Sequence, residues 1–308
     1  MKSYKIDNSF FLKIFNELIN KKSNINLNNN YEFIYRNLSK EEEENILEEV
    51  KREISLASKK KVGEHRKKIW SDAWKDVYQE YIKELNLDSL NPSFIGKSKV
   101  LRFDGNYILP ISDNFELNFY SYIRNILGQI FFENINHVYE FGCGSAFNLA
   151  YFSKTYKEIN FYGTDWAISS IKIIESLKND HKLKIDGFYF DFFHPNYLLN
   201  IHPNSIFLTM CALEQIGSNF NPIIDFFINK KPKLVIHLEP IVDFYNPQNP
   251  FDDLAMKYHK ERGYLLGFYE KLIELEKNKT IDIIFSKRIR FGSLFQESYS
   301  LIVWQPKT

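Results

Sequence analysis

The chain has 308 residues, of which 44% are hydrophobic and 26% are charged, as in folded globular proteins and unlike disordered chains. This length allows one large domain, or a medium domain with a helical partner, because single cores stop growing near roughly 250–300 residues. The 40 basic and 39 acidic side chains nearly cancel, and the formal charge of +1 disfavours nucleic acid as a partner.

Residues 1–115 are predicted to form a helical N-terminal region. Apolar residues of SFFLKIFNELI recur at helical spacing, and Ser39 precedes an acidic run as the N-cap of a second helix. A further helix carries four aromatic residues on one face, at Trp70, Trp74, Tyr78 and Tyr81. Such a stripe usually packs in a core, and the alternative is that it lines a substrate cleft.

The second region, residues 116–308, alternates short apolar runs with helical segments from residue 138 onward, which is the pattern of a parallel α/β sheet. We expect strands at 138–141, 160–164, 186–190, 205–210, 233–238, 281–285 and 298–304, and helices at 146–156, 167–179, 220–229 and 251–278. The predicted fold class is α/β, with a Rossmann-like, seven-stranded, mostly parallel sheet that ends in an antiparallel hairpin. Right-handed crossovers place the loops after the parallel strands along one edge, where a ligand site is expected.

The strongest functional signal is VYEFGCGSAFNL, which leads from a strand through a glycine turn into a helix. Gly142 and Gly144 permit a tight turn and close approach of a ligand, and the start of the helix offers unpaired N–H groups. The next strand ends in YGTDWA, where Asp165 can accept hydrogen bonds from both ribose hydroxyls of a nucleoside. Without this context, Asp165 would be interpreted as a strand-end or capping acid.

These motifs resemble those of the class I S-adenosylmethionine-dependent methyltransferases, over roughly residues 120–308. In that family an acidic residue precedes G-x-G and often a third glycine, whose place Ala146 takes here. The resemblance implies that S-adenosylmethionine is bound by Glu140, Gly142, Cys143, Gly144, Asp165, Trp166, Asp191, Phe192, Ala212 and Glu214.

The resemblance also implies separate roles within this set. Asp165 would hold the ribose, Trp166 would cover the adenine, and Asp191, with Phe192 beside it, would meet the adenine amino group. For Asp191 a plain capping role is an equally open interpretation. Cys143 is interpreted as a small space-filling residue rather than a nucleophile, because no base is evident near it in the sequence.

A nicotinamide-dependent oxidoreductase is the alternative that also uses glycines and a ribose-binding acid. The mid-chain position of the glycine turn, its relaxed third glycine and the terminal hairpin favour methyl transfer. The predicted reaction moves a methyl group to an oxygen or nitrogen of a small molecule, such as a natural-product or cell-surface-glycan intermediate. A protein or peptide methyltransferase and a non-catalytic cofactor-binding module remain open.

Candidate catalytic and acceptor-site residues follow the later strands. In KLVIHLEP, Glu239 lies at the ligand-bearing edge, whereas His237 is equally well explained as a core histidine. His259 could accept a proton at neutral pH, or lie on a surface helix. Arg262 could hold an acidic acceptor group, or pair within its helix. The turn before the last strand adds Arg288, Arg290, Ser293 and Glu297, with solvated turn charges as the alternative.

Cys143 and Cys211 are the chain's two cysteines, and they have no metal-ligand spacing, so neither a disulfide framework nor a metal site is predicted. The N-terminal segment is interrupted by charges and does not fit a signal peptide. No stretch approaches the roughly twenty apolar residues of a membrane span. We therefore expect a cytoplasmic enzyme with no membrane partner; the sequence does not indicate an oligomeric state.

Overall fold

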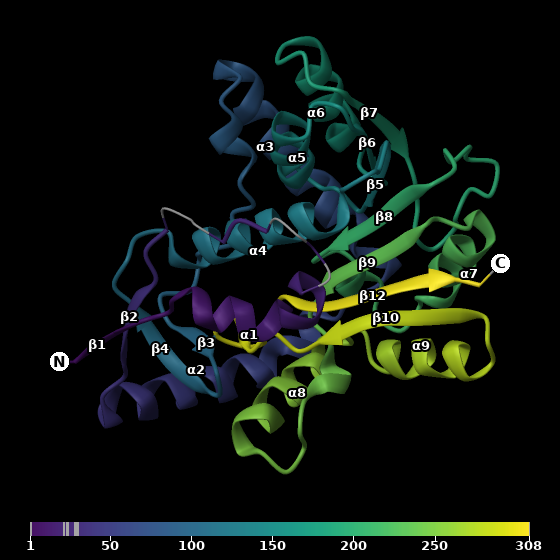
Figure 1. Ribbon diagram of the computed structural model, residues 1–308. Coiled ribbons are helices and arrows are strands. Elements are labelled where there is room, and N and C mark those ends of the chain that lie inside the picture. Colours follow the sequence, from purple (N-terminus) through teal and green to yellow (C-terminus); the bar gives the residue numbers. More distant parts are fainter. Residues whose placement is uncertain (1, 21, 23–24, 28–30, 308) are drawn as a thin grey trace.

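A seven-stranded sheet lies at the centre of the computed structural model, which describes residues 2–20, 22, 25–27 and 31–307 (Figure 1). Its strands are β5 (His137–Phe141), β6 (Asn160–Asp165), β7 (Ile185–Tyr189), β8 (Ser205–Met210), β9 (Leu234–Glu239), β10 (Ile281–Lys287) and β12 (Ser300–Pro306). They lie in the order β10-β12-β9-β8-β5-β6-β7. The strands from β5 to β9 pair in parallel, which confirms the predicted mostly parallel sheet.

The last strand, β12, runs antiparallel to both of its neighbours, β9 and β10. Its first residue, Ser300, pairs with Glu239 at the carboxyl end of β9, so the segment before β12 lies at the edge where the parallel strands end. This segment is longer than a hairpin turn and contains β11 (Phe291–Gly292), which belongs to another sheet. After β7 the chain crosses back over β5, and β8 lies on the other side of β5 from β6. In open α/β sheets, ligands bind at the carboxyl ends of the strands where the strand order reverses in this way, at a switch point.

Helices cover both faces of the sheet, because its strands alternate large apolar side chains between the two faces. Val138 belongs to the core on one face, and its neighbour Tyr139 belongs to the core on the other. The first face is covered by α4 (Phe115–Phe131), α5 (Phe147–Thr155) and α6 (Ile168–Asn179), and the second by α7 (Asn221–Lys230) and α9 (Phe268–Lys277).

The long helix expected at 251–278 is two helices, which corrects that prediction. The first, α8 (Pro250–Arg262), ends where Gly263 adopts a left-handed conformation with φ of 72°. The second, α9, starts after Gly267, which is also left-handed. Glycine in this conformation caps and ends a helix, so the continuous apolar pattern concealed a break.

The N-terminal region contains strands as well as helices, which corrects its description as helical. The helices are α1 (Asn8–Ile19), α2 (Lys40–Ala57) and α3 (Lys67–Glu84). The strands β1 (Ser3–Lys5), β2 (Ile34–Asn37), β3 (Leu101–Phe103) and β4 (Asn106–Pro110) join β11 in a five-stranded sheet of order β1-β2-β4-β3-β11. Short 3₁₀ turns occur at Ser58–Lys60, Glu64–Arg66, Leu87–Leu90, Leu213–Ile216 and Val242–Phe244.

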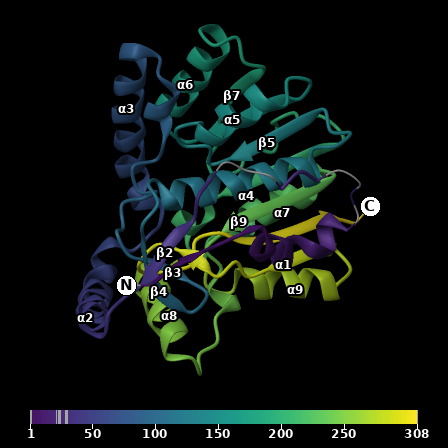
Figure 2. The same cartoon turned by 60° about the vertical axis from the view of Figure 1, so that its left-hand side comes forward.

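Two local signals explain how this region folds. Ser39 caps α2 in a capping box with Glu42, as its position before the acidic run predicted. Asp104 and Gly105 form the tight turn between β3 and β4, both with positive φ, and an Asp-Gly pair of this kind is a strong hairpin signal. Figure 2 shows α2 beside α8 and α3 beside α6, so this region reaches across the C-terminal region.

Candidate functional site

The glycine turn after β5 and the acid at the end of β6 are bound to each other. The N–H groups of Gly142 and Cys143 donate to the carbonyl of Thr164, at 2.8 and 3.0 Å. The N–H of Gly144 donates to Oδ2 of Asp165 at 2.9 Å, and the N–H of Ala167 donates to Oδ1 at 2.8 Å. The turn's own amides are therefore largely used within the fold, and the Asp165 carboxylate is fixed by backbone groups.

A cleft opens above this turn, at the carboxyl edge of the switch point. Its outer part is lined by Trp70, Trp74, Phe94, Gly142, Asp165, Trp166, Phe190, Phe192, Cys211, Ala212 and Gln215. An adjoining part is lined by Trp74, Pro92, Phe94, Ile95, Tyr120, Glu140, Gly142, Cys143, Gly144, Ser145, Phe147, Asn148, Met210 and Cys211. The walls of the outer part are mainly aromatic, and the acidic groups of the two parts, Asp165 and Glu140, come from strand ends.

The aromatic stripe of α3 has two roles. Trp70 and Trp74 stack at 5.7 Å and line the cleft, with Trp74 close over Gly144. Tyr81 is fully buried and stacks on His181, and Tyr78 packs at the margin of the same core. The first half of the stripe therefore lines a cleft, and the second half packs in a core.

Glu140 lies buried beneath the glycine turn in a polar network. Its Oε1 accepts from Nδ2 of Asn148 at 2.7 Å, while Oε2 has no hydrogen-bond partner. Tyr120 donates to Oδ1 of Asn148, and Arg124 lies nearby. Burial raises the pKa of Glu140 to about 8, against the opposing effects of Asn148 and Arg124. Burial also raises the pKa of Asp165 to about 6.

Trp166 and Phe192 line the cleft, whereas Asp191 lines neither of its parts. Nε1 of Trp166 is buried without a hydrogen-bond partner. Asp191 is nearly buried, accepts from the N–H of Phe193, and forms an ion pair with Lys67 of α3 at 2.5 Å. Both of its oxygens are thus engaged by protein groups.

A possible metal-ligand cluster lies at the same place. Ligand atoms of Glu64, Asp191 and His194 lie within 4.8 Å of one another. The ammonium group of Lys67 contacts both Glu64 and Asp191 and so takes the position of a cation between these carboxylates.

Glu214 and Glu239 support the loop after β8 rather than line the cleft. Glu239 is fully buried and accepts from the N–H groups of Ala212 and Leu213, at 3.1 and 3.2 Å. Its side chain is hydrogen-bonded to that of Glu214. Burial raises the pKa of both carboxyl groups, and for Glu239 the neighbouring charge of Glu214 raises it further. Glu239 therefore positions Ala212, which does line the cleft.

The two other candidate catalytic residues lie on α8. His259 is 0% exposed, both of its ring nitrogens lack hydrogen-bond partners, and burial lowers its pKa to about 3. It lines neither part of the cleft, and Tyr245 and Tyr264 surround it. Proton transfer by His259 would need access that these contacts do not provide. Arg262 is 8% exposed and packs on the ring of Tyr264 at 4.7 Å.

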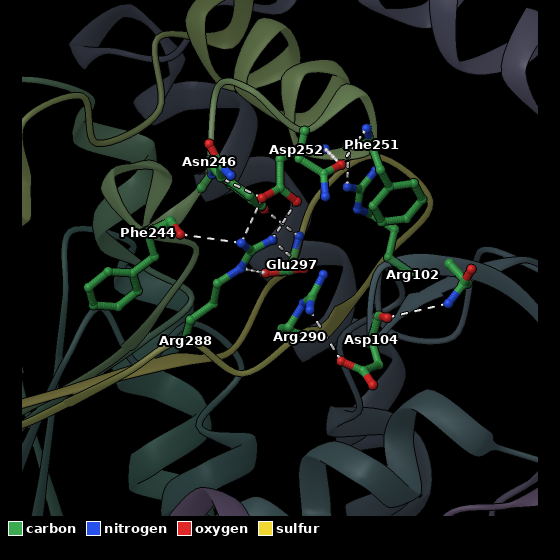
Figure 3. A network of polar contacts seen from close by, with 12 residues as sticks. Arg102, Asp104, Phe244, Asn246, Phe251, Asp252, Arg288, Arg290 and Glu297 are labelled. Atoms are coloured by element: carbon green, nitrogen blue, oxygen red, sulfur yellow. Dashed lines mark hydrogen bonds and ion pairs between the residues drawn. The ribbon is translucent and has the colours of Figure 1, made fainter.

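The turn before β12 holds a buried ion network (Figure 3). Arg288 binds Asp252 and Glu297 with paired contacts of 2.6–2.8 Å. These carboxylates raise the pKa of Arg288 against the effect of its burial. Arg290 makes a looser pair with Asp104 at 3.4 Å. Arg288 and Glu297 are thus engaged with each other, rather than solvated as in the alternative interpretation.

Several cleft residues were not predicted from sequence. Trp70 and Trp74 carried a signal, the aromatic stripe, but Phe94, Tyr120 and Gln215 reach the cleft only through tertiary contacts. Asn148 could have been noticed, because it stands on the first turn of the helix that follows the glycine turn. Within the described residues no helix has both the length and the apolar content needed to cross a membrane.

No family model and no curated protein sequence matches the chain. Solved structures do match it, including an O-methyltransferase family protein from Burkholderia thailandensis (TM-score 0.47, 12% identity) and a riboflavin-derivative dimethyltransferase, RosA, from Streptomyces davawensis (TM-score 0.42, 13% identity). Each match covers 63% of this chain and 58% of the other. Both TM-scores are below 0.5.

Proposed function

We propose that this chain is an enzyme that binds S-adenosylmethionine in the cleft and transfers its methyl group to an oxygen or nitrogen of a small molecule. One observation carries the proposal. The Asp165 carboxylate lies in the cleft between the glycine turn and an aromatic wall, in a position to accept hydrogen bonds from a ribose. Trp166, Phe190 and Phe192 provide the apolar surface that an adenine ring requires.

The residues around Asp165 fit a nucleoside with a charged amino-acid tail. Oε2 of Glu140 and Nε1 of Trp166 are buried polar atoms without partners, and such atoms cost free energy unless a ligand or water satisfies them. Glu140 lines the adjoining part of the cleft, where it can accept from a ligand ammonium group. The antiparallel β12, which is typical of the methyltransferases that the sequence resembles, further supports this donor.

The donor, when bound, supplies a methyl carbon that its sulfonium already activates. The protein's own residues then have to align the acceptor and exclude water. The aromatic walls of the adjoining part, among them Phe94, Tyr120 and Phe147, suit both tasks. Glu239, His259 and Arg262 line neither part of the cleft, so we assign none of them to contact with the methyl group, and Glu239 acts by positioning Ala212.

A small acceptor fits this cleft better than a protein does. Trp70, Trp74 and Phe94 of the N-terminal region form one wall, so that this region, residues 1–115, acts as a cover over the methyltransferase domain at 116–308. A covered aromatic cleft admits a metabolite, such as a natural-product or glycan intermediate, whereas a peptide would need an open groove.

Isothermal titration with S-adenosylmethionine and with NADH tests the donor. We expect saturable binding of S-adenosylmethionine and no binding of NADH. Binding of NADH alone would replace the proposal with a nicotinamide-dependent oxidoreductase. Incubation of methyl-labelled donor with fractionated cell extract then tests the acceptor, and label in the small-molecule fraction is expected. Label in a single protein would favour the protein-methyltransferase alternative.

A further inference from the structure

A second pocket lies at the edge of the central sheet opposite the cleft. Four lysines line it, and we call it the lysine pocket: Lys154, Lys157, Lys182 and Lys184. The first two belong to α5 and the turn before β6, and the last two lie in the turn between α6 and β7. Because these turns lead into the amino ends of parallel strands, whereas the cleft lies at their carboxyl ends, the two sites are separate.

Two hydrogen bonds bring the lysines of these turns together. The backbone N–H of Lys184 donates to Oγ of the buried Ser153 at 3.0 Å, next to Lys154 in the chain. Nζ of Lys184 donates to the carbonyl of Glu158 at 3.1 Å, next to Lys157. The fold of α5, α6 and their turns therefore places all four lysines around one pocket.

The positive charge of the lysine pocket is not balanced by carboxylates inside it. No acidic side chain is among its lining residues, and in the part of the chain that the structure describes none of its four lysines forms an ion pair. The nearby Asp180 and Asp186 are bound by Ser176 and Lys178. Four ammonium groups of like charge thus share one pocket, and an anion would relieve their repulsion.

The other lining residues fix the shape of the pocket and give it an apolar part. His181 stacks on Tyr81 of α3 at 6.1 Å, and Oγ of Ser176 donates to the hydroxyl of Tyr81 at 3.3 Å. Leu87, just after α3, and Leu183 are partly buried against the same core. The pocket therefore lies where the N-terminal region meets the central sheet, on packed elements, and its leucines offer apolar surface beside the charges.

We propose that the lysine pocket binds an anion that carries several phosphate charges. An ammonium group is a compact charge with three N–H donors, which suits the oxygens of phosphate groups. A ligand with several phosphates can engage lysines of both turns at once, so it gains more than a single phosphate does. The ligand is neither the methyl donor nor its acceptor, because the cleft lies at the other edge of the sheet, and its binding does not depend on the proposed function.

Isothermal titration of the full chain with tripolyphosphate, cytidine triphosphate, inorganic phosphate and cytidine tests this site. We expect saturable binding of both triphosphates, binding of inorganic phosphate that is weaker by about tenfold or more, and no binding of cytidine. Tighter binding of cytidine triphosphate than of tripolyphosphate would identify an organic phosphate that contacts the leucines, and equal binding would identify a free oligophosphate. Absence of saturable binding of both triphosphates would overturn the site.

A double variant locates the bound anion. Lys154→Gln combined with Lys182→Gln removes one charge from each turn and should weaken tripolyphosphate binding by about tenfold or more. Lys51→Gln combined with Lys260→Gln is the matched control, because it removes two exposed lysines of α2 and α8, at the other end of the molecule from α5 and α6 (Figure 1). The control should change the affinity less than about twofold. Equal effects of the two double variants would overturn the site.

Titration with S-adenosylhomocysteine on the same proteins separates this site from the proposed function. Its affinity should be the same for the parent chain and for the lysine-pocket variant, and thermal melting should show that both are folded. Displacement of bound tripolyphosphate by S-adenosylhomocysteine would place the anion in the cleft and overturn the proposal. If the parent chain binds tripolyphosphate through these lysines but does not bind S-adenosylhomocysteine, the proposed function fails and the lysine pocket stands.

Discussion

A Cβ atom added at Gly142 would lie 2.6 Å from the Cβ atom of Ala212, so the glycine turn and the loop after β8 approach as closely as their backbones permit. The same atom would lie 3.0 Å from the ring of Phe192. These contacts join the ends of three strands around one wall of the cleft. Any side chain at Gly142 must therefore push this wall apart.

Gly142→Ala should destabilise the fold by about 2–4 kcal/mol, from backbone strain at φ of 76° together with overpacking. Gly96→Ala is the matched control, because Gly96 has φ of 77° but no atom within 4 Å of the added Cβ. Strain alone should cost about 1 kcal/mol there. Urea unfolding measures the loss in free energy of unfolding for each variant. Equal losses would show that the close approach to Ala212 does not contribute to the effect of Gly142→Ala.

Asp165→Ala should weaken S-adenosylmethionine binding by about tenfold or more, because it removes the carboxylate assigned to the ribose. It also removes the acceptor of the Gly144 and Ala167 N–H groups, so thermal melting must show that the variant is folded. Asp186→Ala on the neighbouring strand removes an exposed carboxylate and should leave the affinity unchanged. Unchanged affinity in folded Asp165→Ala would remove the ribose assignment.

The strands and helices of the central sheet could be predicted because each shows its own hydrophobic period. The N-terminal sheet was missed although Asp104 and Gly105 marked its hairpin, because its short strands are stabilised by pairing with β2 and β11, far away in the sequence. The break between α8 and α9 depends on two left-handed glycines, Gly263 and Gly267, within an otherwise continuous apolar pattern.

The candidate site was predictable where a motif lies on one strand end, as for Asp165 and Gly142. Partners from distant segments were not. Lys67 engages Asp191, and Asp252 engages Arg288, although nothing in the local sequence of either acid indicates these ion pairs. Burial of His259 also depends on tertiary packing around α8. The residue type indicates which interactions a side chain can make. Its burial and its neighbours in the fold determine which of them it does make.

Arg288→Met should destabilise the protein by about 3–5 kcal/mol, because Asp252 and Glu297 are 1% and 2% exposed and would keep buried charges without their cation. Arg290→Met is the control. Arg290 is 38% exposed and paired at 3.4 Å, so about 1 kcal/mol or less is expected. Chemical unfolding at neutral pH compares them. A cost for Arg288→Met no larger than that of Arg290→Met would contradict a structural role for the network.

Glu140 should make the stability of the donor-free protein depend on pH. Burial raises its folded-state pKa from 4.5 to about 8, so between these values the folded protein keeps a proton that the unfolded chain has released. The free energy of unfolding contributed by Glu140 therefore falls as pH rises from about 4.5 to about 8, and is level above that. A buried glutamate charge disfavours the folded state at high pH.

Glu140→Gln should remove this dependence while keeping an oxygen that can accept from Asn148. The free energy of unfolding of the variant minus that of the parent protein should therefore be larger at pH 9 than at pH 5. Urea unfolding at pH 5, 7 and 9 measures this difference. Asp165, whose pKa is raised to about 6, titrates in both proteins, so its contribution largely cancels in the difference. Glu158→Gln, at an exposed position, should show no such trend. A difference between parent and Glu140→Gln that is constant across this range would mean that Glu140 is ionised in the folded protein throughout.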